Sequence, residues 1–421
     1  MAALNSDVKF REVWAWSMYD FANSGYTTVV ITAVFSAYFV SVVAGNAPWA
    51  TFAWTAGLSV SYALILFTGP LVGAWADAHA AKKRLLLYST IGCVVFTALL
   101  YFASPGAVAL ALLLIVVSNY FFGVGENVIA AFLPELADSN AMGRVSGWGW
   151  AFGYLGGLTA LGICLVYILS SHDRPPTVSV PVSMLITAAF FAVCATPTFV
   201  FLRERAKPQP QSGNPLARVM QTLHRTRQYK DLNRFLLCIL FYQAGVSAVV
   251  ALAAIYAEQA MKFSTQQTIE LILVVNVTAA VGAFGFGYLQ DAIGHVRAIA
   301  LTLVGWIVMV FLAFVSTNEL MFWIAANLAG LCMGSSQAAG RALVGYLAPP
   351  ARLAEFFGLW GFAVKAASIF GPLTYGAVTW IFAGNHRLGI LTVGAYFVVG
   401  LIILAGVNVE RGRRVALSAA P

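Results

Sequence analysis

Charged side chains are scarce in this chain: Asp, Glu, Lys and Arg together make up 10% of its 421 residues, whereas 60% of the residues are hydrophobic. Soluble globular domains carry about 25% charged residues. The composition therefore excludes a soluble globular protein. It indicates an all-α membrane protein that crosses the bilayer many times.

Cysteine is also rare, and the five cysteines do not lie close together in the sequence. They are Cys93, Cys164, Cys194, Cys238 and Cys332, each inside a hydrophobic segment. We interpret them as packing residues rather than disulfide partners or metal ligands. The chain also lacks a Gly-x-Ser-x-Gly elbow and a cluster of metal ligands within one hydrophobic segment. We therefore expect no catalytic residues, cofactor or metal site, and no enzyme activity.

What the chain does contain is twelve hydrophobic segments, each close to or above the ~20 residues that cross a bilayer as a helix. The first six are 14–43, 50–76, 84–103, 107–132, 144–170 and 181–202, and the last six are 234–259, 267–290, 298–316, 319–346, 355–381 and 386–408. The segments predict two six-helix bundles (1–202 and 234–408), a cytoplasmic linker (203–233) and a cytoplasmic tail (409–421). The linker fits either an amphipathic surface helix or a plain solvated connection.

Lys and Arg are distributed unevenly around these segments. Most of the 24 fall on one side of the membrane if the N-terminus is inside, which predicts that both termini are cytoplasmic. The net charge of +8 is then explained by topology, without a nucleic-acid partner. The compact length suggests a bacterial protein of the inner membrane.

The two halves share a loop pattern, which indicates an internal repeat. Gly73 and Asp77 precede Lys82 and Lys83, and the stretch from Gly287 through Asp291 to Arg297 repeats this order. Further matches lie 211 residues apart: Gly123 with Gly334, Glu126 with Gln337, and Gly147 with Gly358. Two related six-helix halves are the construction of many secondary transporters.

The first hydrophobic segment carries a polar cluster, with Asn23 and Ser24 three and four residues after Asp20. This spacing puts the three side chains on one face of a helix. A carboxylate at the membrane centre costs about 2.5 kcal/mol or more, so we expect Asp20 to face protein or a water-filled cavity. The alternative is that Asp20 lies near the surface and only forms a capping hydrogen bond.

Several longer stretches resemble the major facilitator superfamily and, within it, the autophagy-related vacuole-effluxer-like family. They are residues 19–26 (Tyr-Asp-Phe-Ala-Asn-Ser-Gly-Tyr), 131–137, 143–150, 153–157, 355–361, Lys365 and 371–373. The resemblance implies two pseudo-symmetric six-helix bundles, a cavity between them, alternating access and a monomer. The fungal members release amino acids from the vacuole. Ala78 and Ala80 depart from the superfamily pattern, which usually has a basic residue and Gly at these positions, and Ala244 stands where relatives often carry Asp.

The resemblance places the first, fourth, seventh and tenth helices around the cavity, and each of them carries polar residues. With Tyr154 and Lys365 added, the predicted substrate-binding or coupling residues are Asp20, Asn23, Tyr26, Asn119, Glu126, Asn127, Tyr154, Gln243, Asn327, Gln337 and Lys365. The alternative for the Asn and Gln residues is hydrogen bonding between helices, worth about 0.6 kcal/mol each.

Lys365 lies ten residues beyond Glu355, about 15 Å along a helix. At that depth an ammonium group needs a partner. We expect Lys365 to bind an anionic group of the substrate, while Asp20 or Glu126 binds an amine or a proton. A structural pair between Lys365 and an acid is the alternative.

The inner loops predict a cytoplasmic gate, because an acid can meet the positive N-terminal end of a helix. Its residues are Asp77, Lys82, Lys83, Arg144, Asp291, Arg297 and Arg352. The alternative is an Asp that only caps its own turn.

Taken together, the sequence predicts a secondary active transporter that moves a small polar solute across the bilayer. The preferred cargo is an amino acid or a similar zwitterion. We expect the transporter to export this cargo and to couple the export to protons. A sugar, peptide, drug-like cation or lipid remains an alternative cargo, as does a non-transporting sensor on the same scaffold.

Overall fold

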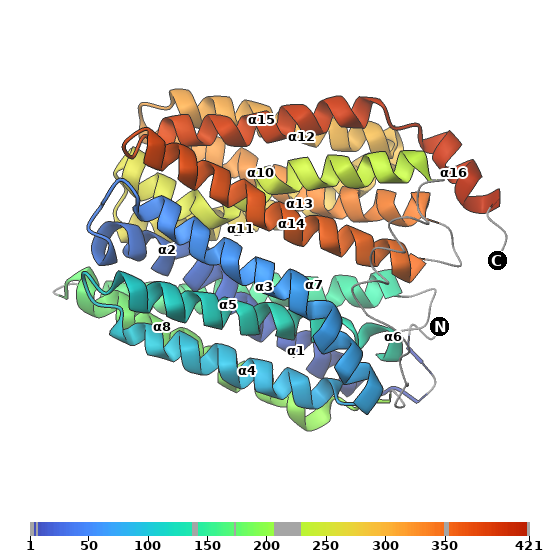
Figure 1. The fold of residues 1–421 in the computed structure, drawn as a ribbon, viewed down its shortest axis with the longest axis horizontal. Coiled ribbons are helices and arrows are strands. Elements are labelled where there is room, and N and C mark those ends of the chain that lie inside the picture. Colours follow the sequence, from blue (N-terminus) through green and yellow to red (C-terminus); the bar gives the residue numbers. More distant parts are fainter. Residues whose placement is uncertain are drawn as a thin grey trace. The chain divides into compact units, whose positions relative to one another are not determined.

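The computed structural model describes residues 4–5, 7–136, 142–171, 174–205, 229–348 and 353–418. Within these residues the first half contains α1 (Phe10–Tyr26), η1 (Thr27–Ala33), α2 (Phe35–Tyr38), η2 (Phe39–Val43), α3 (Ala50–His79), α4 (Lys82–Leu99), η3 (Leu100–Phe102), α5 (Val108–Ala130), α6 (Leu133–Leu136), α7 (Met142–Ser170) and α8 (Pro176–Phe201). The second half contains α10 (Lys230–Met261), α11 (Thr265–Ile293), α12 (His295–Val315), α13 (Glu319–Leu347), α14 (Leu353–Ile381), α15 (His386–Ala405) and α16 (Val409–Ser418) (Figure 1).

These helices coincide with the twelve predicted segments to within a few residues, counting the stretch from α1 to η2 as one. In the described part of the chain, nine stretches are both long and apolar enough to cross a membrane. The other three predicted segments correspond to α11, α13 and α14, each 29 residues long. The predicted all-helical fold is confirmed. Most of the predicted linker, residues 206–228, lies outside the described residues.

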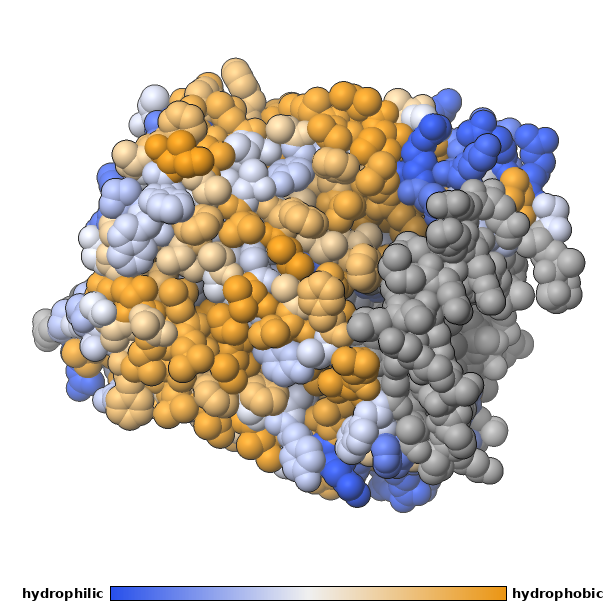
Figure 2. Space-filling view, viewed as in Figure 1, coloured by the Kyte–Doolittle hydropathy of each residue, from blue (hydrophilic) through white to orange (hydrophobic). Residues whose placement is uncertain are grey.

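The outer faces of the helices are apolar along their lengths. Val193, Leu320 and Ile402 are each about 70% exposed, and Figure 2 shows hydrophobic residues spread over the visible helices, with hydrophilic residues at their ends. A soluble protein rarely exposes so much contiguous apolar surface. These faces are therefore suited to contact lipid.

The described residues divide into two compact units. Unit 1 takes those within Met1–Ala50, Val60–Pro215 and Ser264–Ile269, and unit 2 takes those within Thr51–Ser59, Leu216–Phe263 and Glu270–Pro421. In unit 1, α1 packs on α7 and α8, and α4 packs on α5 and α8. In unit 2, α10 packs on α14 and α15, and α12 packs on α13 and α15. The same four helix pairs therefore occur in both units, with α10, α12, α13, α14 and α15 as the counterparts of α1, α4, α5, α7 and α8.

The repeat extends to single close contacts. A β-carbon at Gly156 of α7 would overlap the carbonyl oxygen of Phe21, and one at Gly371 of α14 would overlap that of Ala244. In both units, helices therefore meet backbone to backbone at a glycine, as small residues permit in membrane helices. Ala244, the position where relatives often carry Asp, thus lies at a packing contact.

A second pair of contacts fixes the register of the repeat. A β-carbon at Gly125 of α5 would overlap the hydroxyl of Tyr19, and one at Gly340 of α13 would overlap that of Tyr242. The contacts relate the two units by the same two offsets. Residues of α10 lie 223 positions after their counterparts in α1, and residues of α13 and α14 lie 215 positions after their counterparts in α5 and α7. The sequence-based offset of 211 is therefore wrong by about one helical turn, because glycines recur every few residues along these helices.

The C-terminal tail is held against unit 2 by a charged contact. Arg411 of α16 donates to both carboxylate oxygens of Asp231 in α10, at 2.7 Å each, and Asp231 is almost completely buried. Hydrogen bonding to this carboxylate raises the pKa of Arg411. The backbone N–H of Asn408 also donates to Asp231. The predicted tail thus includes an ordered helix.

We expect Gly156→Ala to lower the free energy of unfolding by about 1–3 kcal/mol, because the added methyl group must push apart two backbones. The measurement is the thermal unfolding midpoint of purified protein in nanodiscs. Gly162→Ala is the matched control on the same helix, because a β-carbon there meets nothing within 4 Å. Alanine is the better helix former, so the control should unfold at the same temperature or higher. Equal midpoints for the two variants would contradict the close contact.

Candidate functional site

Asp20 lies on the face of α1 that packs against the glycines of α7. A β-carbon at Gly149 would lie 2.6 Å from Asp20 Oδ2, and one at Gly153 would lie 2.9 Å from Ser24 Oγ. The small residues of α7 therefore make room for the polar side chains of α1. Asp20 and Ser24 are half-buried, which leaves part of this polar face accessible.

Three predicted binding residues lie in the interior of unit 1. Tyr26 is completely buried, its hydroxyl lies 2.9 Å from Ser118 Oγ, and its ring stacks on Phe122. Asn119 is also completely buried and donates from Nδ2 to Ser61 Oγ at 2.5 Å. Asn23 is 6% exposed. For Asn119 this contact is the interhelical hydrogen bond of the alternative interpretation, and Tyr26 makes a contact of the same kind.

The other predicted residues of unit 1 are more accessible. Glu126, near the end of α5, is half-buried and the adjacent Asn127 is exposed. Tyr154 of α7 is half-buried, with its ring centroid 6.4 Å from that of Trp150. These residues remain candidates for contact with a solute.

In unit 2, Lys365 is half-buried within α14, twelve residues from the first residue of the helix and sixteen from the last. Gln243 of α10 and Gln337 of α13 are also half-buried. Asn327 of α13 donates from Nδ2 to the carbonyl oxygen of Trp323 in its own helix, at 2.8 Å. Lys365 therefore has the mid-helix position that the sequence predicts.

Arg341 follows Asn327 and Gln337 along the polar side of the tenth predicted helix, but it is not among the predicted binding residues. This half-buried residue of α13 holds its guanidinium carbon 5.2 Å from the ring centroid of Trp360 in α14. The offset of 215 residues makes Arg341 the counterpart of Glu126. An acid and a base thus occupy equivalent positions in the two units. Helical spacing places Arg341 on the polar side of its helix, and the correct repeat register adds that it is the counterpart of Glu126.

Ser247, a polar residue of the seventh predicted helix, forms a hydroxyl pair in unit 2 that the sequence did not predict. Ser247 Oγ of α10 lies 3.1 Å from Ser368 Oγ of α14. By the same offsets Ser247 corresponds to Ser24, and Ser368 corresponds to Gly153. The first helix of each unit therefore carries a polar face at equivalent positions but with different charge, because the counterpart of Asp20 in unit 1 is Gln243 in unit 2.

Four of the seven predicted gate residues lie outside the description of the structure. Arg352 is not among the described residues, and the side chains of Asp77, Arg144 and Asp291 are not described although their helices are. Arg297 is exposed in the first turn of α12. The gate therefore remains a prediction.

Lys82 and Lys83 form hydrogen bonds within unit 1. Their backbone N–H groups donate to the two carboxylate oxygens of Glu204, at 2.8 and 3.1 Å, which places an acid at the positive N-terminal end of α4. Lys82 Nζ lies 3.2 Å from a carboxylate oxygen of Glu135 in α6. Lys83 Nζ donates to the carbonyl oxygen of Leu202. The lysines thus connect the start of α4 to α6 and to the residues after α8.

The same region anchors the N-terminus through Arg205. Its guanidinium contacts Asp7 at 2.7 Å and Glu12 at 2.9 Å, and its backbone N–H donates to Glu135. The hydrogen bond from Arg205 lowers the pKa of the exposed Asp7 carboxyl group. Arg205 thereby holds the first residues of the predicted linker against unit 1.

Comparisons with known proteins agree with this architecture. Residues 40–417 match a family model described as vacuole effluxer Atg22 like. The chain is 30% identical over 406 residues to the MFS-type transporter YxiO of Bacillus subtilis (strain 168), covering 94% of each chain. It is 23% identical over 475 residues to autophagy-related protein 22-1 of Penicillium rubens, covering 90% of this chain and 78% of the relative. A crystal structure of a variant of the nucleoside transporter NupG superposes with a TM-score of 0.73 at 14% identity, covering 94% of this chain and 98% of the other.

We expect Ala80→Gly to stabilise the turn between α3 and α4. Ala80 ends α3 with φ +45°, a left-handed conformation that costs a non-glycine residue about 1 kcal/mol or more. Glycine should therefore raise the thermal unfolding midpoint, by an amount reduced by its greater freedom in the unfolded chain. Ala81→Gly is the adjacent control, because φ at Ala81 is −123°. A higher midpoint for the Ala81 variant than for the Ala80 variant would refute this explanation.

Proposed function

Because this chain belongs to the vacuole effluxer Atg22-like family and has the fold of major facilitator transporters, we propose that it is a secondary active transporter that exports a small zwitterion such as an amino acid. Family and fold are those of multi-pass membrane transporters rather than of enzymes. The fold does not choose the cargo, because similar structures include nucleoside and D-xylose transporters. The proposed cargo therefore depends on the charged residues.

The observation that carries the proposal is the position of Lys365 in the middle of α14. A charged side chain at this depth is costly, about 2.5–3.5 kcal/mol on insertion scales, and usually serves a function. An ammonium group can bind the carboxylate of a zwitterion by a charge-assisted hydrogen bond. Arg341 supplies a second cation on the neighbouring helix α13, and its contact with Trp360 restricts where the guanidinium can lie.

Unit 1 supplies the groups of opposite charge. Asp20 and Glu126 are half-buried carboxylates on α1 and α5, so either can bind the ammonium group of a zwitterion. A carboxylate that is exposed in one conformation and buried in another can also take up and release a proton. We therefore propose that protons are the coupling ion and that Asp20 carries them.

We expect Lys365→Ala to reduce amino-acid transport at least tenfold, because the substrate carboxylate loses its counter-charge. The measurement is counterflow of a panel of radiolabelled amino acids in proteoliposomes, with the amount of folded protein checked by gel filtration. Lys365→Arg should retain part of the activity. Lys230→Ala is the control, because Lys230 is exposed at the first residue of α10 and should leave transport unchanged.

Normal counterflow by the Lys365→Ala variant would overturn the role of this lysine. If the wild-type protein transports no amino acid in the panel, the proposed cargo is wrong. A thermal-shift screen of sugars, nucleosides and peptides would then identify the class of cargo. Proton coupling is tested in the same vesicles with an internal pH dye. Substrate-driven acidification that persists in Asp20→Asn would exclude Asp20 as the proton carrier.

A further inference from the structure

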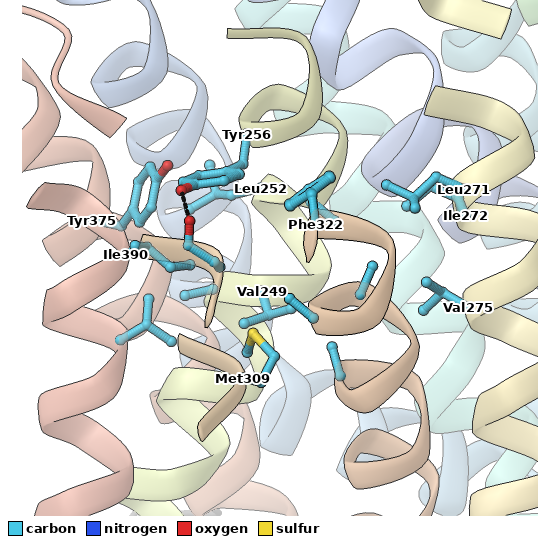
Figure 3. A pocket seen from close by; sticks show the side chains of 17 residues that line it. Val249, Leu252, Tyr256, Leu271, Ile272, Val275, Met309, Phe322, Tyr375 and Ile390 are labelled. Carbon is cyan, nitrogen blue, oxygen red and sulfur yellow. Dashed lines mark hydrogen bonds between the residues drawn. The ribbon is translucent and has the colours of Figure 1, made fainter. Parts of the chain in front are cut away.

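Unit 2 contains an internal cavity of about 70 Å³ whose wall is entirely apolar. All six long helices of the unit contribute to it, α10 to α15. Figure 3 shows Tyr256, Phe322, Met309 and Tyr375 among the side chains around this space. The cavity therefore lies at the point where the six helices meet, and not on one exposed face.

Tyr256 and Tyr375 line the cavity with their rings, and the hydroxyl group of each contacts another group of the protein. The Tyr256 hydroxyl donates to the carbonyl oxygen of Ala313 at 2.7 Å (Figure 3). The Tyr375 hydroxyl lies 3.0 Å from Nδ1 of His386. With both hydroxyl groups engaged, the wall offers no donor or acceptor to an occupant.

An apolar wall decides what can occupy this space. One water molecule needs about 10–15 Å³ of such volume and two to four polar partners. The cavity has the volume for several waters but none of the partners, so it should stay dry, as apolar cavities do. Its volume is about half that of the ~150 Å³ apolar cavity that binds benzene or xenon. An occupant must therefore be uncharged, apolar and small.

The cavity has an identifiable entrance. Of the residues that line it, Val249 and Ala253 of α10, Val275 of α11 and Ala326 of α13 are half-buried, and the others are buried. These four partly exposed residues are aliphatic, and we take them as the entrance to the cavity.

The cavity is separate from the polar residues proposed to bind the transported solute. On α13, Phe322, Ala325, Ala326 and Ala329 line the cavity and follow one another at helical spacing along one face. The predicted binding residues of the same helix, Asn327 and Gln337, lie on an adjoining face and are not among the residues that line the wall. The cavity is thus a second site.

We propose that this cavity is a binding site for a small hydrocarbon group, the size of a xenon atom or a short alkyl chain. Two sources share this chemistry, the end of a lipid acyl chain and a free apolar molecule. The side chains that line an empty cavity lack dispersion contacts on one side, and an occupant would supply these contacts. It would thereby strengthen the packing among all six helices of unit 2.

Xenon is the first probe, because it fits the volume and carries no polar group. Xenon-129 NMR on protein in nanodiscs should give a saturable shift above that of empty nanodiscs. Ala325→Leu fills the cavity and should weaken binding at least tenfold. Ala280→Leu is the matched control: Ala280 is exposed on α11 and does not line the cavity, so binding should stay within twofold of wild type.

Two more variants keep the test decisive. If Ala325→Leu does not fold, Ala326→Leu at the half-buried entrance should block binding with less strain. Met309→Ala enlarges the cavity and should allow benzene to bind at least fivefold more tightly than in the wild type. The proposal is overturned if the wild-type protein shows no saturable xenon signal, or if the control loses as much binding as the filled variants.

A lipid with a photoactivatable diazirine at the end of its acyl chain separates the two sources. Adducts on Met309 or Tyr256 that disappear in Ala325→Leu would assign the site to lipid tails. Xenon binding without such adducts would support the site and assign it to a free apolar molecule. Neither readout requires transport, so a failure here is distinct from a failure of the proposed function.

Discussion

The close approach of α1 to α7, and of α10 to α14, sets the internal structure of each unit. Gly156 and Gly371 place the backbones of two helices in direct contact, at Phe21 and Ala244 respectively. In lipid, helix association depends on such packing because the surrounding acyl chains are as apolar as the side chains. The contact fixes the rotation and depth of the first helix of each unit, and with them the direction of every polar side chain on that helix.

The polar residues have positions that follow from this packing. Asp20 and Ser24 lie over the glycines of α7, and their counterparts in unit 2 are Gln243 and Ser247. The same helix packing therefore positions a negatively charged side chain in unit 1 and neutral side chains at the equivalent places in unit 2. Glu126 and Arg341 show the same divergence with opposite charges. Duplicated halves of this kind can keep their packing while their binding chemistry changes.

The apolar cavity and the polar residues occupy different faces of the same helices in unit 2. The aliphatic face of α13 closes a space without donors or acceptors, while its polar residues lie on the adjoining face. The same helix thus contributes to packing among the six helices and to the proposed contact with a solute. A change on one face, such as a change of cavity occupant, can alter the position of the other.

The twelve helices were predictable from the sequence, because each hydrophobic segment must satisfy its own backbone hydrogen bonds when surrounded by lipid. The position of Lys365 in the middle of α14 was also predictable, since position along a helix follows from residue number. Tertiary structure alone decided that Tyr26 and Asn119 are buried and form hydrogen bonds inside unit 1, and that Lys82 and Lys83 contact Glu204 and Glu135. It also corrected the repeat register, because the glycine pattern allows several alignments and only one lets each tyrosine hydroxyl meet its glycine. Burial, register and pairing depend on neighbouring helices that are far away in the sequence, whereas the existence of each helix depends on its own residues.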